Sequence, residues 1–237
     1  MRFHAPLLKG HLIKRYKRFL ADVKLESGEV VTAHCANSGS MLSVNEPGSE
    51  VWLSPAKNKG RKLKFTWELI RCKDFLVGIN TQHPNKLVAE AIQNEQVPEL
   101  AGFSELKREV KYGENSRIDI LLKDSQKGLC YVEVKNVTMR RGLSKDTPVE
   151  FPDAVTSRGT KHLFELSTMV QAGHRAAMFY LVQREDGISG VAIANDIDPL
   201  YGEALGEAQA VGVQILAYGC TVSPSEIKVT KRLKFLG

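Results

Sequence analysis

The spacing of the apolar residues changes at residue 81, and this change limits the possible folds more than any other feature of the chain. Up to residue 80, apolar and β-branched residues recur with a period of two, and no helical pattern lasts three turns. Beyond it, helical and strand-like patterns alternate. The 237 residues are enough to bury two self-sufficient cores. We therefore expect two domains of different architecture, residues 1–81 and 82–237.

About five strands are expected in the first domain, separated by segments rich in Gly, Pro, Asn and Ser. The strands cover residues 12–25, 29–36, 50–53, 62–72 and 75–80. Five short antiparallel strands in this length predict a small barrel like the oligonucleotide-binding (OB) fold.

The positive charge of the chain is concentrated in the same domain. Residues 1–80 contain 14 Lys and Arg against 7 Asp and Glu, whereas residues 81–237 contain 19 against 20. Such a field attracts polyanions, and the release of counterions from phosphates drives nucleic-acid binding without regard to sequence. A basic surface that is merely solvated is the alternative.

Two basic stretches of this domain are interleaved with aromatic residues. Their candidate DNA-binding cations are Lys14, Arg15, Lys17, Arg18, Lys57, Arg61, Lys62 and Lys64, and Lys59 lies in the second stretch. Cations that bind phosphates beside rings that stack on bases suit a nucleic-acid strand. The rings of Tyr16, Phe19, Phe65 and Trp67 could instead pack in the barrel core.

The second domain reads as a mixed α/β unit. Helices are expected at residues 84–94, 156–172 and 198–210, strands at 104–113, 117–122, 130–137, 176–183 and 213–217, and a loop at 140–152. The order is helix, three strands, helix, strand, followed by a closing helix and strand. No internal repeat is present.

Two of these strands carry a group of residues that suits phosphodiester chemistry. Asp119 and Glu133 are separated by one hairpin, and Glu133 and Lys135 share one face of their strand because side chains alternate. Two carboxylates suit a hard cation such as Mg²⁺ or Mn²⁺, and the lysine can orient water or stabilise developing charge. A third metal ligand would come from Glu90 on the preceding helix, or from Glu109 on the first strand.

This spacing also occurs by chance, and a surface salt bridge between Lys135 and one acid is the simplest alternative. The order of helices and strands, however, places both motif strands at the active edge of the restriction-endonuclease-like PD-(D/E)XK fold. The next helix, which begins with Arg158, Lys161 and His162, can supply a further basic residue to such a site. Lys161 is the candidate, although a solvated helix face would explain it equally well. Asp153 is expected to be a cap or turn residue.

Several segments, in order along most of the chain, resemble the sugar fermentation stimulation protein A (SfsA) family. They are Arg15–Val23, Asn37-Ser-Gly-Ser-Met41, Lys64–Leu69, Gly78–Thr81 with Pro84-Asn85, Ser116–Asp119, Tyr131–Val137, and Phe151–Thr156 with Arg158–Leu163. The family's usual Asn-Thr-Gly-Ser-Met has Ser in place of Thr here, which keeps the hydroxyl group. The resemblance implies an OB-like front domain, a nuclease-like rear domain, and DNA binding without sequence preference. It also implies a regulatory link to sugar metabolism, particularly that of maltose.

We therefore expect a DNA-binding protein with a nuclease-like core, or alternatively an active Mg²⁺-dependent nuclease. A small-molecule enzyme or sugar sensor is the weakest hypothesis, because the sequence has no phosphate loop, dinucleotide fingerprint or nucleophile elbow. No apolar run approaches the roughly 18 residues of a spanning helix. The expectation is a cytoplasmic protein without an obligate protein partner, and the oligomeric state is open.

Overall fold

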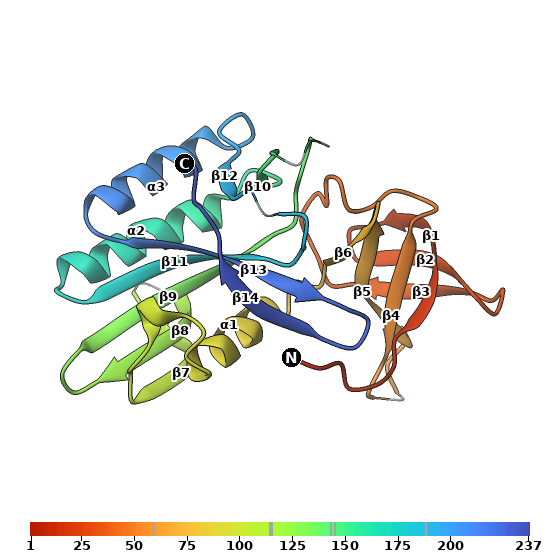
Figure 1. Ribbon diagram of the computed structural model, residues 1–237, viewed down its shortest axis with the longest axis horizontal. Helices are drawn as coiled ribbons and strands as arrows, with labels where there is room; N and C mark the ends of the chain where they lie inside the picture. The colour runs from red at the N-terminus through yellow and green to blue at the C-terminus, as the bar shows by residue number, and fades with distance from the viewer. Residues whose placement is uncertain (59, 114–115, 143, 145, 188) are drawn as a thin grey trace.

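The computed structural model describes residues 1–58, 60–113, 116–142, 144, 146–187 and 189–237. Lys59, and Leu143 and Lys145 of the expected loop, lie outside the described residues. Within them, two six-stranded sheets stand side by side, one near each end of the molecule's long axis (Figure 1). The chain has the mixed α/β class expected from its sequence.

The first sheet is a closed barrel. Its strands are β1 (Leu8–Tyr16), β2 (Leu20–Leu25), β3 (Val30–Cys35), β4 (Glu50–Pro55), β5 (Phe65–Cys72) and β6 (Phe75–Gly78). They are ordered β3-β2-β1-β4-β5-β6, and an additional parallel pairing of β3 with β5 closes a barrel of five strands, with β6 attached to β5. Trp67 is fully buried inside it. The predicted OB-like barrel is confirmed.

One expected strand of the barrel is in fact a hairpin. Residues 12–25 were expected to form a single strand, but a turn at Lys17, Arg18 and Phe19 separates β1 from β2. Lys17 and Arg18 have φ values of 49° and 61°. Because this turn uses left-handed residues other than glycine, the sequence carries no Gly, Pro or Asn to mark it.

The second sheet is a twisted layer with helices on both faces. Its order is β14-β13-β11-β9-β8-β7, from β7 (Glu105–Tyr112), β8 (Ser116–Asp124), β9 (Gly128–Val137), β11 (Arg175–Val182), β13 (Gln214–Val222) and β14 (Ile227–Arg232). The helices are α1 (Pro84–Gln93), α2 (Ser157–Gln171) and α3 (Pro199–Ala210). α1 packs on one face, and α2 with α3 on the other (Figure 1).

The chemistry of the helix ends agrees with these boundaries. Pro84 begins α1, where its missing N–H is not needed. The Thr156 hydroxyl accepts a hydrogen bond from the Gly159 amide and caps α2, and the Asp198 carboxylate caps α3 in the same way. The central parallel strand β11, which pairs with β9 and β13, is almost entirely apolar and buried, as a strand covered on two sides must be.

Three short elements were not expected from the sequence. A 3₁₀ turn covers Pro98–Leu100, and β10 (Val149–Phe151) and β12 (Val191–Ile193) form a small parallel pair. Near the C-terminus, β14 extends the main sheet by pairing with β13. No helix in the described part of the chain could span a bilayer.

Asp153 connects the barrel to the part of the chain that forms the second sheet and its helices. Its carboxylate accepts a hydrogen bond from the Met41 amide (2.9 Å), and its carbonyl accepts one from the Ser40 hydroxyl (2.6 Å). A Cβ atom on Gly39 would lie 2.8 and 2.9 Å from the two carboxylate oxygens of Asp153, so only glycine fits there without a shift. Asp153 is thus a capping residue, as expected, but it caps a loop that is distant in sequence.

Candidate functional site

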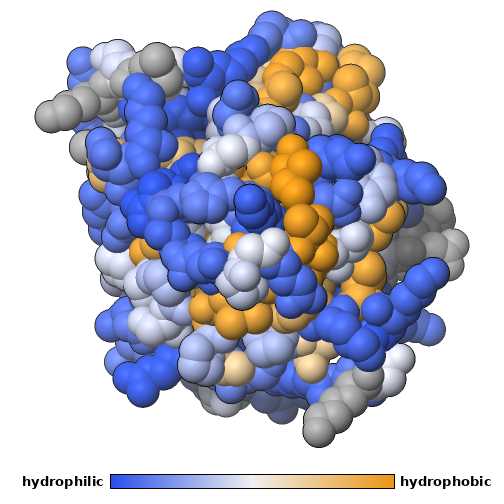
Figure 2. Space-filling model, turned by 90° about the vertical axis from the view of Figure 1, so that its right-hand side faces the viewer, coloured by the Kyte–Doolittle hydropathy of each residue, from blue (hydrophilic) through white to orange (hydrophobic). Residues whose placement is uncertain are grey.

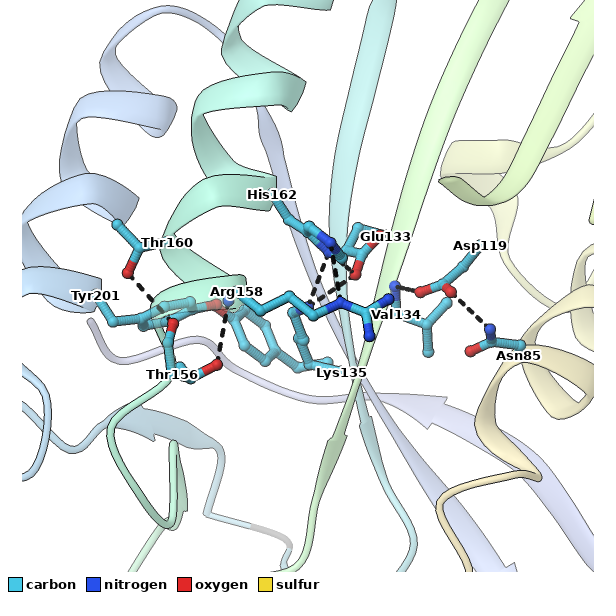
Figure 3. A network of polar contacts seen from close by, with 12 residues as sticks. Asn85, Asp119, Glu133, Val134, Lys135, Thr156, Arg158, Thr160, His162 and Tyr201 are labelled. Carbon is cyan, nitrogen blue, oxygen red and sulfur yellow. Dashed lines mark hydrogen bonds and ion pairs between the residues drawn. The ribbon is translucent and has the colours of Figure 1, made fainter. Parts of the chain in front are cut away.

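The three residues expected to carry the chemistry lie on adjacent strands of one sheet. The pairing of β8 with β9 ends at Ile120 and Val132. Asp119 and Glu133 are the next residues on the two strands. The Asp119 carboxylate accepts hydrogen bonds from the Val134 amide (2.8 Å) and the side-chain amide of Asn85 (2.6 Å). Asp119 is therefore held between β9 and α1 (Figure 3).

Glu133 lies beside Asp119 but has different partners. Its Oε1 accepts a hydrogen bond from Lys135 Nζ (2.8 Å) and contacts His162 Nδ1 of α2 (Figure 3). Its Oε2 is buried and has no hydrogen-bond partner within the described residues. The two carboxylates are close neighbours, yet Asp119 turns towards α1 and Glu133 towards α2, because β8 and β9 are not paired beyond Ile120.

The two carboxylates have pKa values shifted in opposite directions. Burial, and next the charge of Glu133, raise the pKa of Asp119 to about 6. Burial also acts to raise the pKa of Glu133, but the contacts with His162 and Lys135 outweigh it and hold this pKa below its ordinary value. Glu133 is therefore deprotonated at a lower pH than Asp119, which becomes negatively charged only as the pH approaches neutrality.

His162 and Asn85 are the site residues that sequence reasoning did not select. Arg158 Nε lies 3.4 Å from His162 Nε2, and the other ring nitrogen of His162, Nδ1, faces Glu133. A signal for His162 did exist, because it falls on the same helical face as the buried Leu163 and Leu166. Asn85 had no such signal, since only the packing of α1 against β8 brings it to Asp119.

Lys161 and Glu90 are not brought to this site. The half-exposed Lys161 side chain lies 3.6 Å from Glu165, on a different face of α2 from His162. Glu90 accepts a hydrogen bond from the amino group of Met1 (3.0 Å), because its position on α1 faces β14 and the N-terminus. Glu109, the alternative ligand, lies closer to the site, where it shares the amide of Asn85 (3.0 Å) with Asp119.

The described residues contain no group of three or more His, Cys, Asp or Glu side chains placed to hold a metal ion. Asp119 and Glu133 could supply two protein oxygen ligands, with water completing the shell. This is a pattern that Mg²⁺ accepts, because it keeps several waters and needs only one or two carboxylates. The unpartnered Oε2 of Glu133 is the atom that fits such a cation best.

A polar cavity of about 260 Å³ opens between the barrel and this site. Its wall is formed by four segments: the loop that follows β3 at residues 37–41 (the barrel loop), the entry to α1, the end of β9, and β10. The lining residues are Asn37, Ser38, Gly39, Thr81, Pro84, Asn85, Val134, Lys135, Asn136, Thr138, Met139, Glu150, Phe151 and Asp153.

The predicted DNA-binding cations have different environments. Lys17, Arg18, Lys57 and Lys62 are exposed. Arg15 instead donates hydrogen bonds to carbonyl groups of the barrel loop at residues 37–40. The turn that carries Lys17 and Arg18 therefore lies against the loop that lines the cavity.

The strand register connects the two basic stretches on the outside of the barrel. Lys14 pairs with Asp22, and Asp22 pairs with Thr32, so the three side chains form a row across β1, β2 and β3. Lys64 immediately precedes Phe65, which pairs with Ala33 on the neighbouring strand. Seen from the barrel end, hydrophilic side chains cover much of the surface, and hydrophobic side chains gather in a central strip and in a separate patch at the upper edge (Figure 2).

The aromatic residues of these stretches divide between core and surface. Trp67 is in the core, whereas Phe19 is 48% exposed beside Lys17 and Arg18. Tyr16 is half-buried, donates a hydrogen bond to Asp22, and lies beneath Lys14 Nζ, which is 5.3 Å from the ring centroid. A ring and two cations are thus available together at the β1–β2 turn.

Comparison with known proteins agrees with the motifs. The family model described as the sugar fermentation stimulation protein RE domain matches residues 82–226, and the one described as the SfsA N-terminal OB domain matches residues 13–79. The chain belongs to the SfsA family. Among curated members, the sugar fermentation stimulation protein homolog of Rhodospirillum rubrum is 58% identical over 231 residues, 94% of either chain. That of Paramagnetospirillum magneticum is 57% identical, over 96% of this chain and 94% of the relative.

A solved SfsA structure has the same fold along the whole chain. SfsA of Pyrococcus furiosus, described as a complex with Ca²⁺, superimposes with a TM-score of 0.88 at 27% identity. The match covers 100% of this chain and 98% of the archaeal one. The arrangement of barrel and sheet is therefore that of the SfsA family.

Proposed function

We propose that this SfsA-family protein binds DNA without sequence preference through the basic outer surface of its barrel, and leads the strand to the site around Asp119, Glu133 and Lys135. The observation that carries the proposal is the position of the β1–β2 turn. Arg15 donates hydrogen bonds both to the Arg18 carbonyl of this turn and to the Gly39 carbonyl, and residues 37–39 line the same cavity as Lys135. A strand held by the turn would pass directly to the site.

The lack of sequence preference follows from the groups available on the barrel. Long, exposed lysine and arginine side chains bind phosphates, which are the same in every sequence. Phe19 can add stacking, which is tolerant of sequence because every base has an aromatic face. We further propose that the barrel and the nuclease-like unit are separate domains that meet after Thr81.

A second candidate function is divalent-metal-dependent cleavage of DNA. It is favoured by the buried, unpartnered Oε2 of Glu133 and by the description of the Pyrococcus furiosus relative as a Ca²⁺ complex. Asp119 and Glu133 would hold the ion, with Mg²⁺ or Mn²⁺ as the expected active metal. When bound, such an ion polarises a phosphate and activates a water molecule.

The protein's own groups have clear roles in that reaction. Lys135 places a positive charge beside Glu133, where it would stabilise charge developing on a bound phosphate. His162 and Arg158 hold Glu133 from the α2 side and fix the direction of its carboxylate. Asn85 does the same for Asp119 from α1.

The family name links these proteins to sugar fermentation, and we propose that DNA binding serves the regulation of sugar use, with maltose metabolism as the expected target. In this role the nuclease-like core contributes to binding whether or not it turns over. Binding and cleavage can therefore be tested separately.

Binding is tested by fluorescence anisotropy with unrelated duplexes in EDTA, over a range of salt concentrations. If four cations contact phosphates, the slope of log K against log salt is about −3.6. Charge reversal in Lys17→Glu/Arg18→Glu should make the slope less negative by about 2 and weaken binding equally for every sequence. The control is Lys107→Glu/Lys123→Glu, with the same charge change on β7 and β8, which should leave the slope unchanged. Binding that does not depend on salt would contradict the proposal.

Cleavage is tested on single- and double-stranded DNA with Mg²⁺ or Mn²⁺. Lys135→Ala should abolish any activity while binding persists, because Lys135 belongs to the site and not to the barrel surface. Intact substrate under every metal, together with intact binding, would remove the nuclease candidate and leave the DNA-binding function.

A further inference from the structure

The cavity between the barrel and the site has a wall of neutral polar groups. Amides and hydroxyls predominate in it, and its charged residues are bound to other protein groups. Lys135 contacts Glu133, Asp153 accepts from the Met41 amide, and Glu150 receives two hydrogen bonds from Arg141. With the carboxylates of Asp153 and Glu150 at its wall, the cavity is unsuited to a phosphate group. It suits a neutral ligand that both donates and accepts hydrogen bonds.

Two side-chain amides offer complementary groups for such a ligand. Asn85 uses its amide nitrogen on Asp119 and Glu109, and its oxygen turns away from them (Figure 3). Asn136 accepts a hydrogen bond from Gln183 through Oδ1 (2.7 Å), which leaves its amide N–H groups as donors. One acceptor and one donor are therefore presented at the same cavity.

The remaining walls supply apolar surface and set the size. Met139 and Phe151 line the cavity beside the amides. Its volume of about 260 Å³ is slightly below the roughly 300 Å³ at which drug-sized ligand sites begin. A single flat ring system fits these dimensions and this mixture of groups.

We propose that the cavity is a subsite for one nucleobase, recognised through its hydrogen-bonding edge by Asn85 and Asn136. The base would belong to a DNA strand, which rests on the proposed function; a free nucleotide carries the same chemistry. Because Lys135 lines both the cavity and the site, a base held in the cavity places its own backbone beside Asp119 and Glu133.

A base can enter the cavity only after it has left its partner in the duplex. Extrusion from a duplex costs unpairing and unstacking energy, which a base that is already unpaired does not require. The protein should therefore bind DNA with an unpaired base more tightly than fully paired DNA of the same length and composition.

The test compares affinities for two duplexes in EDTA, one fully paired and one with a single bulged base. We expect about tenfold tighter binding to the bulged duplex, because one stacked or flipped base typically adds this much affinity in nucleic-acid-binding proteins. Ser38→Trp, which fills the cavity from an exposed loop position, should remove this preference, so that the two duplexes bind with the same affinity. Ser27→Trp is the matched control, because Ser27 is an exposed serine in the β2–β3 turn of the same barrel, outside the cavity lining.

The outcomes separate this inference from the proposed function. No binding to either duplex would overturn DNA binding itself. Binding to both duplexes with equal affinity, or a preference that Ser38→Trp does not change, would overturn the base subsite alone. A competition arm with free nucleoside monophosphates identifies the source: competition that Ser38→Trp abolishes supports the subsite and shows that free nucleotides also enter it.

Discussion

Arg15 allows a direct test of whether a cation of the barrel stabilises the fold or binds DNA. It lies in the first basic stretch and was predicted to contact DNA. In the structure its guanidinium donates to the carbonyls of Asn37 (3.0 Å), Gly39 (2.9 Å) and Ser40 (3.4 Å). We expect Arg15→Ala to destabilise the protein more than it weakens DNA binding.

The expected magnitude follows from these contacts. A hydrogen bond from a charged donor contributes about 1.5–3 kcal/mol, and the two shorter bonds are only part-buried, so they should contribute near the lower end of this range. We therefore expect a loss of about 2–3 kcal/mol in the free energy of unfolding. At about 2–4 °C per kcal/mol for a chain of this size, Tm should fall by about 4–12 °C.

The assay combines calorimetric unfolding with anisotropy binding for Arg15→Ala, Arg15→Lys and Lys17→Gln. Arg15→Lys keeps the charge but not the fork of donors, so it should lose most of the same stability. Lys17→Gln, at an exposed position of the neighbouring turn, should keep its Tm and weaken binding. If Arg15→Ala unfolds like the wild type and weakens binding as much as Lys17→Gln does, the assignment of Arg15 to the loop is refuted.

Two further predictions concern the site and the contact of the barrel with Asp153. Burial and Glu133 raise the pKa of Asp119 to about 6, so Asp119 is protonated below that pH. If the proposed metal site binds Ca²⁺ through Asp119, Ca²⁺ affinity measured calorimetrically should fall by up to about tenfold per pH unit below 6 and level off above 7. Affinity that is constant from pH 5 to 7 would exclude Asp119 as a ligand. In urea unfolding, Gly39→Ala should lower the free energy of unfolding by about 1–3 kcal/mol, because the new Cβ atom would meet the carboxylate of Asp153. Gly206→Ala, whose Cβ atom would meet no atom within 4 Å, should be neutral or stabilising. Equal stabilities for these two variants would argue against close contact at Gly39.

Most of the architecture was predictable because it depends on local patterns. A period of two in the first eighty residues, and alternating periods afterwards, were enough to predict the barrel, the mixed sheet and the order of the main elements. The errors occurred where local signals are weak. The turn at Lys17 and Arg18 has no turn-forming residue, and the short strands β10 and β12 depend on partners about forty residues apart in the chain.

The sequence alone determined that Asp119, Glu133 and Lys135 lie on neighbouring strands, since one hairpin separates them and side chains alternate. It could not determine what surrounds them. Asn85 and His162 reach the two carboxylates, and Glu90 and Lys161 do not, because the rotation of α1 and α2 against the sheet decides which face of each helix meets it. Only the packing of segments distant in sequence fixes that rotation. Packing of the same kind places the Arg15 side chain against the barrel loop.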